Sequence, residues 1–363
     1  MNRPTTSTIH FVKGRGSGSN TQSRFLAAMK DRSEAEPPPF DEDDGEAPLA
    51  TEVSEHKAKS IISRNDSPDI GFDQSINPYL GCEHGCIYCY ARPTHAYIGL
   101  SPGRDFESKL FAKTNAAEIL RKELNRPSYE PSVIALGANT DPYQPIERKL
   151  GITRAVLEVL QEFRAPVSIT TKGAAITRDI DILSAMAAQG LARVNISLAT
   201  MDADIARKMD PRAPSPKRRL EVVKALADAG IPVAIFTSPV IPALTDVDLE
   251  RILQSAAEAG ARYASYVMLR LPLEVRDLFV EWLEAHFPLR AQHVMSLVAQ
   301  SHNGRDYNST FGQRMRGTGV HADMVAQRFR IATRRYGMNQ NRLTLDTSKF
   351  SRQRDSHQQQ SLF

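Results

Sequence analysis

The chain has 363 residues, which allows two to three domains of about 150 residues or one large α/β barrel. With 41% hydrophobic and 24% charged residues it can bury a substantial core, which excludes a wholly disordered protein. We expect neither a membrane span nor export, because the sequence contains no long apolar run and no apolar signal core near its start. The formal net charge of +4 is too small to indicate a nucleic-acid or lipid partner by itself.

Residues 1–55 have the composition of a disordered tail. They contain a glycine–serine run, three consecutive prolines and an acidic block at residues 41–44, with few residues able to form a core. Between residues 31 and 55 there are ten acids and one arginine, a net charge of 9 negative. We therefore expect this tail to stay solvated.

From about residue 73, short β-branched or apolar runs alternate with helical stretches. This alternation is typical of βα units with a parallel sheet. The six expected strands cover residues 75–80, 133–137, 167–171, 193–198, 233–237 and 263–269. Six such units predict an α/β fold, a partial (β/α)6 TIM-type barrel that occupies residues 56–272.

Helices are expected over residues 114–126, 153–164, 177–190, 215–230 and 245–260. Thr177 and Ser215 are candidate N-cap residues, and a proline follows Ser215 at the first helical position. Thr245 and Asp248 have the spacing of a capping box. Glycine closes each of the last three helices at its C-terminal end.

Residues 273–363 form a C-terminal extension that we expect to be helical as far as residue 337 and loosely structured beyond it. Between residues 305 and 354 there are ten arginines, one lysine and three acids, a net charge of +8. This basic segment is a candidate contact for nucleic-acid phosphates. The alternative is that its arginines pack on acidic neighbours.

All three cysteines lie within eight positions, as Cys82, Cys86 and Cys89 in GCEHGCIYCY. The cluster follows the first expected strand, so it should lie at the carboxyl end of the barrel, where α/β barrels place their chemistry. An odd, small number of cysteines does not make a disulfide framework. Zinc with His84 as a fourth ligand is one alternative, although zinc sites usually combine two separated ligand pairs. An iron–sulfur cubane is the other, and three cysteines would leave one iron open.

The spacing C-x3-C-x-aromatic-C, with Tyr88 as the aromatic residue, resembles the hallmark of the radical S-adenosylmethionine (radical SAM) superfamily. The resemblance implies that the three cysteines hold a [4Fe-4S] cluster, and that S-adenosylmethionine chelates the fourth iron. It also implies reductive cleavage of the sulfonium, after which a 5′-deoxyadenosyl radical abstracts hydrogen from a substrate. The partial (β/α)6 barrel of that superfamily agrees with the six expected strands. Glu83 and His84 are then expected to shape the loop without acting as ligands.

Longer runs are similar to the spore photoproduct lyase-like branch, often labelled DNA repair photolyases: NPYLGCEHGCIYCYAR, GANTDPYQPIE, ITTKG, ISLAT and MDPRAPSPKRR. That lyase is expected to use a further cysteine as hydrogen donor, and this chain has none to spare. The resemblance therefore extends to the cofactor site and not to the substrate. Tyr90 or Tyr97 could relay a hydrogen atom instead, although packing is the commoner role for such tyrosines.

Polar residues at the expected strand ends are the other candidates for cofactor binding. By the resemblance, Asn139, Thr140 and Asp141 bind the amino group of S-adenosylmethionine, whereas the alternative is an ordinary turn. Lys172 and Ser197 correspond to a lysine and a serine expected to bind its carboxylate.

Tyr88 is expected beside the adenine, with core packing as the alternative. Arg212 lies on a proline-stiffened loop and suits a carboxylate or phosphate, or else forms an ion pair with Asp210. The cations at residues 217–219 begin a helix, where they oppose the helix dipole, and they indicate either an anionic partner or a solvated surface.

Two functional hypotheses follow. The first is a radical SAM enzyme that abstracts hydrogen from an unidentified substrate, with nucleic acid as a candidate, and that receives electrons from a flavodoxin- or ferredoxin-like donor. The second is a non-catalytic iron–sulfur or zinc protein that senses redox state or binds nucleic acid. Both predict a reducing cytoplasmic location, because exposed thiolates are lost to oxidation.

Overall fold

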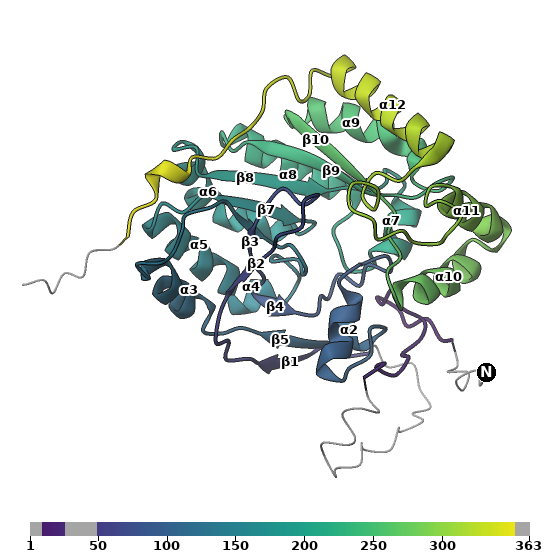
Figure 1. Ribbon diagram of the computed structural model, residues 1–363, viewed down its shortest axis with the longest axis horizontal. Coiled ribbons are helices and arrows are strands. Elements are labelled where there is room, and N and C mark those ends of the chain that lie inside the picture. Colours follow the sequence, from purple (N-terminus) through teal and green to yellow (C-terminus); the bar gives the residue numbers. More distant parts are fainter. Residues whose placement is uncertain (1–8, 26–48, 353–363) are drawn as a thin grey trace, which may run out of the picture.

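The computed structural model describes residues 9–25 and 49–352. Its centre is a curved sheet with the strand order β10-β9-β8-β7-β6-β3-β2 (Figure 1). All neighbours are parallel except β2, which pairs antiparallel with β3. The strands are β2 (Ile62–Arg64), β3 (Gln74–Ile76), β6 (Ile134–Leu136), β7 (Val167–Thr171), β8 (Ala192–Ser197), β9 (Val233–Val240) and β10 (Tyr263–Met268). The six parallel strands confirm the expected partial barrel.

Helices cover one face of this sheet. They are α3 (Ala116–Asn125), α4 (Glu147–Leu150), α5 (Ile152–Glu162), α6 (Ile180–Ala187), α8 (Pro216–Asp228) and α9 (Leu249–Glu258). Under them the strands present aliphatic side chains that are fully buried, such as Ile169 opposite Val194 and Ile196 opposite Ile235. These residues and the apolar faces of the helices form the main core. Burial of a parallel sheet under helices explains why its strands are rich in β-branched residues.

The opposite face of the sheet is polar, because alternate residues of a strand point to opposite sides. The Arg193 Nε donates to the Ser168 hydroxyl at 2.8 Å. The Asn195 amide donates to the Ile169 carbonyl at 3.0 Å. The concave side of the barrel is therefore lined by groups that already have hydrogen-bond partners, and it keeps a hydrophilic character.

The first expected strand, residues 75–80, divides into two. Its first part is β3, and its second part, β4 (Tyr79–Leu80), leaves the barrel to pair with β5 (Lys109–Ala112). Together with β1 (Glu52–Glu55) these form a separate sheet of order β1-β5-β4, which the sequence pattern did not predict. The division falls at Pro78, whose ring removes a backbone donor and interrupts the ladder.

The expected N-cap at Thr177 is wrong. Residues Ala174–Asp179 form a 3₁₀ helix (η2), in which the Thr177 hydroxyl donates to the Ala174 carbonyl at 2.9 Å, and α6 begins only at Ile180. The N-cap at Ser215 is confirmed, since its hydroxyl accepts from the Arg218 backbone at 3.3 Å.

The capping box of Thr245 and Asp248 is also wrong. The Thr245 hydroxyl accepts from the Ile241 backbone at 2.8 Å, so it closes a local turn before the helix. Residues Asp246–Asp248 form a 3₁₀ helix (η3) ahead of α9. The short helix α7 (Ala203–Met209) was not expected.

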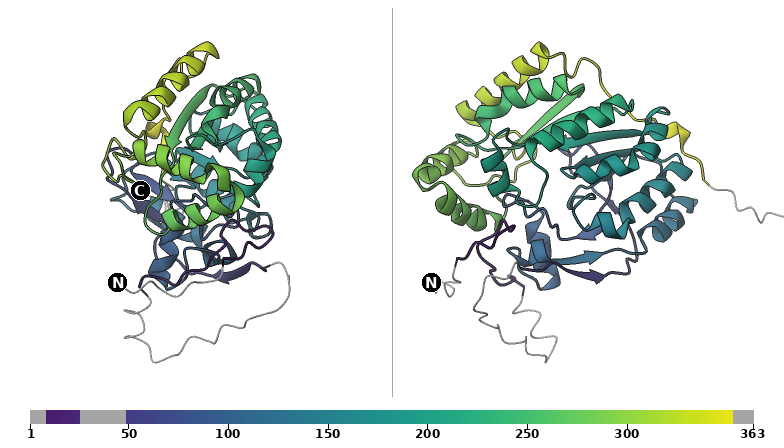
Figure 2. Two further views of the ribbon diagram at one scale, coloured as in Figure 1. Left: turned by 90° about the vertical axis from the view of Figure 1, so that its right-hand side faces the viewer. Right: turned by 180° about the vertical axis from the view of Figure 1, so that it is seen from behind.

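The expectation of disorder over residues 1–55 is wrong for residues 9–25 and 49–55. Residues 9–25, which we call the N-terminal segment, lie between α2 (Asp105–Ser108) and α10 (Val275–His286) and are drawn in purple in Figures 1 and 2. The Gly16 and Ser17 backbone amides donate to the carboxylate of Glu107, at 2.8 and 3.0 Å. Residues 26–48, which include the acidic block, lie outside the described residues.

Glu107 also forms an ion pair with Arg92, from the 3₁₀ helix η1 (Arg92–Ile98), and both side chains are fully buried. Arg92 in turn donates to the carbonyls of Gly85 and Cys86, at 3.2 and 2.9 Å. Gly16 packs directly on Gly85, since a Cβ atom at Gly16 would lie 1.9 Å from the Gly85 carbonyl oxygen. This network joins the N-terminal segment, α2 and the cysteine loop.

The C-terminal extension is helical as expected, with α10 (Val275–His286), α11 (Pro288–Gln300) and α12 (Gly319–Arg335). Phe279 and Trp282 of α10 form a second core with Ile87 and Tyr88 of the cysteine loop. The Trp282 indole donates to the Lys208 carbonyl at 3.0 Å. Helices α10 and α11 therefore cover the cysteine loop.

Residues 338–352 have little regular structure, apart from a 3₁₀ turn at Thr347–Lys349 (η4), yet they pack on the barrel. The Phe350 ring lies 5.3 Å from that of Tyr129 and 6.3 Å from that of Phe163, centroid to centroid. Residues 353–363 lie outside the described part of the chain. None of the described helices has the length and apolar character needed to cross a bilayer.

We predict that Glu107→Gln lowers the free energy of unfolding by about 3–5 kcal/mol, because it leaves the buried Arg92 guanidinium without its counter-charge. The matched control is Glu118→Gln, which breaks an exposed ion pair with Lys122 and should cost less than about 0.5 kcal/mol. Urea unfolding of the metal-free protein measures both. Equal unfolding midpoints for the two variants would contradict the role given to Glu107.

Candidate functional site

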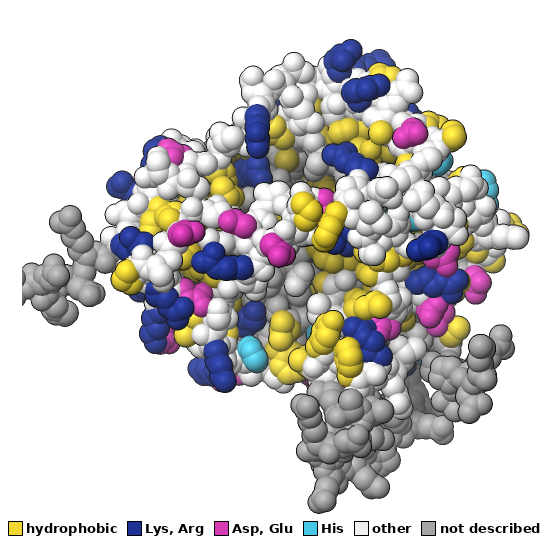
Figure 3. Space-filling view, in the orientation of Figure 1, with side chains coloured by type: hydrophobic (Ala, Val, Ile, Leu, Met, Phe, Trp, Pro, Cys, Tyr) yellow, Lys and Arg dark blue, Asp and Glu magenta, His cyan; other side chains and the backbone are white. Residues whose placement is uncertain are grey.

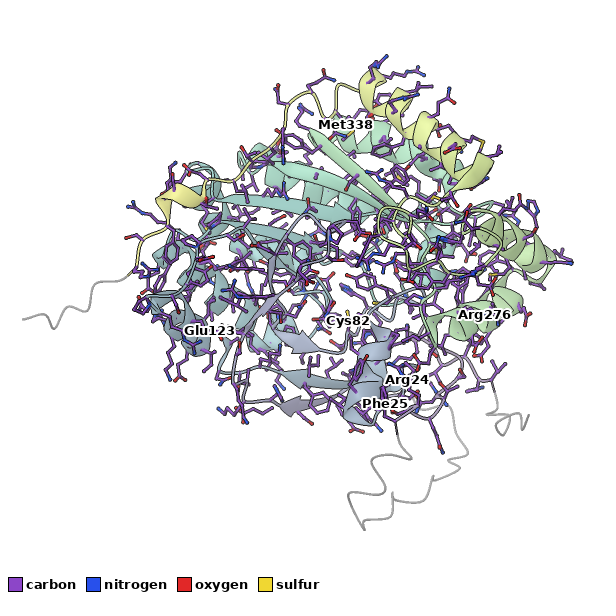
Figure 4. All side chains as sticks on the ribbon, in the orientation of Figure 1. Arg24, Phe25, Cys82, Glu123, Arg276 and Met338 are labelled. Atoms are coloured by element: carbon purple, nitrogen blue, oxygen red, sulfur yellow. The ribbon has the colours of Figure 1, made fainter. Side chains whose placement is uncertain are left out.

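The cysteine loop, residues 81–89, follows β4 and lies near the centre of the molecule, where Figure 4 labels Cys82. The Cys82 backbone amide donates to the Phe106 carbonyl at 2.9 Å. Gly81 adopts a left-handed φ of 77°, and a Cβ atom there would lie 2.7 Å from the Leu110 side chain. The loop path is therefore set by its neighbours in the fold.

Two of the three thiols, those of Cys86 and Cys89, lie in a setting that disfavours the charged form. Cys82 and Cys86 are each 7% exposed, and Cys89 is half-buried. Burial and the nearby Asp210 raise the pKa of the Cys86 thiol, and burial and Cys82 raise the pKa of Cys89. Thiolates at these positions would repel one another, so cations such as iron would stabilise them. In this respect the donor set fits a thiolate-ligated metal cluster.

Within residues 9–25 and 49–352, no three His, Cys, Asp or Glu side chains lie close enough to share one metal ion. A cubane cluster requires a different arrangement, because each cysteine then binds its own iron.

A half-buried cation, Lys172, lies beside the thiols. Lys172 directly follows β7, and its Nζ lies 5.6 Å from the centroid of the Tyr88 ring. Burial lowers the pKa of Lys172, but Cys86 and Asp210 outweigh burial and raise it. Among the described carboxylates none forms an ion pair with Lys172. The ammonium is therefore available to an anion.

Asp210 is already occupied by other donors. Its carboxylate accepts from the Tyr88 hydroxyl at 2.6 Å and from Arg219 at 3.0 Å, and all three side chains are buried. Burial raises the pKa of Asp210, but Lys172 and Arg219 outweigh it and lower the pKa. Tyr88, expected beside the adenine, is thus fixed by its hydroxyl at the wall of the site.

The loop after β6 contains Asp141, whose carboxylate has protein partners of its own. It accepts from the backbone amides of Lys172 at 2.7 Å and Tyr143 at 2.9 Å. The His84 Nδ1 lies 3.2 Å from the Asp141 Oδ2, in an ion pair and not an aligned hydrogen bond. Burial lowers the pKa of His84, but Asp141 outweighs burial and raises the pKa to about 9. Asp141 therefore joins the cysteine loop to the end of β7.

Thr140 has a similar structural partner, since its hydroxyl donates to the Tyr79 carbonyl at 2.9 Å. Asn139 is exposed at the end of the same loop. Ser197 ends β8, the neighbour of β7, and its hydroxyl makes only a long hydrogen bond of 3.4 Å, to the Ser238 carbonyl. The fold thus brings Lys172 and Ser197 to neighbouring strand ends.

Arg212 does not join this group. Its guanidinium contacts Glu83 and the Thr51 hydroxyl, each at 2.9 Å. The alternative ion pair between Arg212 and Asp210 is wrong, because Arg219 holds Asp210. The contact between Arg219 and Asp210 was not expected, because Arg219 was interpreted only as one of the cations at the start of a helix.

The helical periodicity of the sequence could have predicted that Arg219 is buried. It shares the buried face of α8 with Val222, Val223 and Leu226, at spacings of three and four residues. Lys217 and Arg218 are exposed, on the other side of the helix.

The two tyrosines considered as hydrogen relays lie in different surroundings. Tyr97 is 66% exposed and stacks on Phe25 at 5.1 Å, centroid to centroid. Tyr90 is 46% exposed, and its hydroxyl donates to the Ala138 carbonyl, next to the loop that contains Asn139. Arg270, at the end of the β10 region, lies 5.2 Å above the Tyr90 ring.

A partial α/β barrel with a three-thiol loop at the carboxyl end of its first strand defines a class of cofactor-dependent barrel enzymes. The chain belongs to the radical SAM superfamily, whose family description matches residues 76–256. It is 36% identical over 247 residues to an uncharacterized protein of Mycobacterium tuberculosis, covering 67% of this chain and 73% of that protein. An uncharacterized protein of Methanocaldococcus jannaschii is 28% identical over 238 residues, covering 65% and 84%.

Among solved structures, the fold is similar to that of spore photoproduct lyase. A mutant of that lyase aligns with a TM-score of 0.52 at 16% identity, covering 78% of each chain. Its complex with dinucleoside spore photoproduct aligns with a TM-score of 0.52 at 15% identity, again covering 78% of each chain. At this level of identity the likeness shows the shared fold.

We predict that Asp141→Asn lowers the free energy of unfolding by about 2 kcal/mol or more, because an amide nitrogen in place of one oxygen faces a backbone donor. The control is Asp277→Asn, at a side chain that is 71% exposed and should change stability by under about 0.5 kcal/mol. Thermal and urea unfolding of both variants provide the test. A stability unchanged at Asp141 would show that its contacts are dispensable to the fold.

Proposed function

We propose that this chain is a radical SAM enzyme that holds a [4Fe-4S] cluster through Cys82, Cys86 and Cys89 and binds S-adenosylmethionine beside it. The supporting observation is Lys172, a half-buried ammonium with no ion-pair partner among the described carboxylates, which lies over the Tyr88 ring and interacts electrostatically with the Cys86 thiol. Three cysteines leave one iron without a protein thiolate, and a neighbouring cation suits the carboxylate of an amino acid that completes it.

The chain's own residues would bind and orient the cofactors. Lys172 would pair with the methionyl carboxylate, and the Ser197 hydroxyl would donate to it. The loop at Asn139 would face the amino group, and Tyr88 would support the adenine. When bound, the cluster and S-adenosylmethionine supply reductive cleavage of the sulfonium and hydrogen abstraction from a substrate.

The protein would also keep water and oxygen from the cluster. Phe279 and Trp282 of α10 cover one side of the cysteine loop, and Gly16 of the N-terminal segment packs on another. Iron-bound thiolates survive best in a reducing compartment, which for this enzyme would be the cytoplasm.

Nucleic acid is our proposed substrate class. Support comes from the basic C-terminal segment, where Lys and Arg side chains gather over α12 at the top of Figure 3. Part of this charge is already used, since Arg314 pairs with Asp69 and Arg328 with Glu250. The similar fold of a lyase solved with dinucleoside spore photoproduct adds support. With all three cysteines assigned to iron, a substrate radical would have to be quenched by another group, for which we propose Tyr90, an exposed tyrosine whose hydroxyl meets the Ala138 carbonyl.

We predict that anaerobic reconstitution loads about four irons and four sulfides per chain, and that dithionite with S-adenosylmethionine then yields 5′-deoxyadenosine. Cys86→Ala should lose both the cluster absorption and the product, whereas Tyr97→Phe, at an exposed ring remote from the thiols, should keep both. Iron analysis and mass spectrometry provide the readouts. A loaded cluster without any 5′-deoxyadenosine would favour a redox sensor, and a single bound zinc ion would overturn the cluster itself.

We predict that Lys172→Met weakens S-adenosylmethionine binding roughly 10- to 100-fold, because a charge-assisted bond to the carboxylate is lost. The fold should tolerate the change, since Asp210 keeps Tyr88 and Arg219 as donors. Lys224→Met, at an exposed lysine paired with Asp228, is the control. Equilibrium dialysis of the reconstituted proteins measures the affinity. Unaltered binding in the Lys172 variant would remove Lys172 from the cofactor site.

A further inference from the structure

A cavity of about 700 Å³ opens on the outer side of the cysteine loop. We call it the arginine hollow, because its walls include Arg148, Arg178, Arg212 and Arg218, with His84 also exposed to it. Arg148 belongs to α4, Arg178 to η2 and Arg218 to the first turn of α8, and Arg212 lies between α7 and α8. Among the described residues, no Asp or Glu side chain lines the hollow.

The carboxylates that partner these arginines lie mostly beneath the surface. Glu83, which pairs with Arg212, is 4% exposed, and Glu147, which pairs with Arg178, is fully buried. Arg218 pairs with the half-exposed Glu221. Within the described part of the chain, Arg148 forms no ion pair. A molecule approaching from solvent therefore meets guanidinium groups first, and the hollow presents positive charge.

The floor of the hollow is the cysteine loop itself. His84 lies in the sequence between Cys82 and Cys86, and no cysteine is part of the lining. The Arg212 backbone amide donates to the His84 carbonyl at 3.4 Å, and the Arg212 guanidinium forms an ion pair with Glu83. The loop that carries the thiols therefore forms part of the wall of the hollow, although no thiol lines it.

We infer that the arginine hollow is the docking surface for an acidic one-electron carrier protein of the flavodoxin or ferredoxin type. The inference rests on the proposed function, which needs one electron per reductive cleavage. The reduced carrier loses that electron and the oxidised cluster gains it, with no other bond change. A carrier seated in the hollow would contact the cysteine loop at His84 and would leave Lys172 and Ser197 free.

Charge complementarity favours such a carrier over nucleic acid at this surface. Lys172 and Ser197, the proposed cofactor-binding residues, do not line the hollow, so a nucleic-acid strand bound there would not contact them. A carrier has only to approach the cysteine loop. Complementary patches of this kind act mainly by steering the encounter, which raises the association rate.

The test reverses charge at the rim and leaves the floor intact. The variant Arg148→Glu with Arg218→Glu changes two exposed side chains, whereas Arg178 and Arg212 stay in place to neutralise buried carboxylates. The matched control, Arg207→Glu with Arg290→Glu, makes the same change of net charge on the exposed surfaces of α7 and α11, away from the lining of the hollow. Full-length reconstituted protein is used throughout, with a purified flavodoxin and a plant-type ferredoxin as probes.

Two readouts are taken at low ionic strength. Calorimetric titration with oxidised flavodoxin should show binding about tenfold or more weaker in the hollow variant than in the control. Stopped-flow absorption should show cluster reduction by reduced flavodoxin slowed by a similar factor, and the difference should shrink as salt is added. Reduction by dithionite, which needs no docking surface, should be equally fast in all three proteins.

Equal flavodoxin binding and equal flavodoxin-driven reduction in the hollow variant and the control would overturn the inference. So would a hollow variant that binds both carriers normally but loses affinity for single-stranded DNA, which would make the hollow a nucleic-acid site. Failure of the proposed function looks different, because dithionite would then yield no 5′-deoxyadenosine in the unmodified protein.

Discussion

The buried ion pair between Arg92 and Glu107 is the constraint on which the arrangement of this protein depends. A charge without water is costly unless it is paired and its remaining hydrogen-bonding groups are satisfied. Here Arg92 also donates hydrogen bonds to carbonyls that include those of Gly85 and Cys86. The Glu107 carboxylate accepts a hydrogen bond from the Gly16 backbone amide. Three segments distant in sequence therefore have one joint arrangement. As a result, these contacts set the path of the cysteine loop.

A loop held in this way presents different chemistry on its two faces. On the inner face the Cys86 thiol lies near Lys172 and Asp210, inside a core closed by α10 and α11. On the outer face Glu83 and His84 contact Arg212 and Asp141. Glycines at 81 and 85 allow the backbone to turn between these faces, since both adopt left-handed conformations next to close neighbours. Neighbouring residues of this loop therefore point to different surroundings, with Cys86 toward the core and Glu83 toward Arg212.

The sequence predicted those features whose causes are local. Buried parallel strands such as β7 and β9 can be recognised in the sequence as runs of β-branched residues. Ser215 marks the start of α8, because its hydroxyl caps the helix. The clustering of the three cysteines marked the site, because thiolate ligation needs donors at short spacing. The burial of Arg219 could also have been predicted, because it lies on the apolar face of α8. Its charge was instead interpreted only through the helix dipole.

What the sequence could not predict depends on partners far along the chain. The glycine–serine run of the N-terminal segment has a disordered composition, yet Gly16 fits where no side chain can, and its amide meets Glu107 some ninety positions away. The pairing of β1 with β5 is equally remote, since Val53 lies opposite Leu110. The amino-acid composition of a segment does not show whether such contacts form, because each contact depends on one complementary residue elsewhere in the chain.

The separation of charge across the cysteine loop also bears on how two anions could be bound without competition. Lys172 is half-buried, where an ion pair is stronger and less affected by salt than an ion pair on the open surface. Arg148 and Arg218 face water, where attraction is weak at any one site and screened over roughly 10 Å at 0.1 M salt. The inner cation therefore suits tight binding of a small carboxylate, and the outer group suits brief encounters with a large acidic partner. An electron carrier must leave after each transfer, so weak, salt-sensitive attraction on the outer face is the physical property that repeated reduction requires.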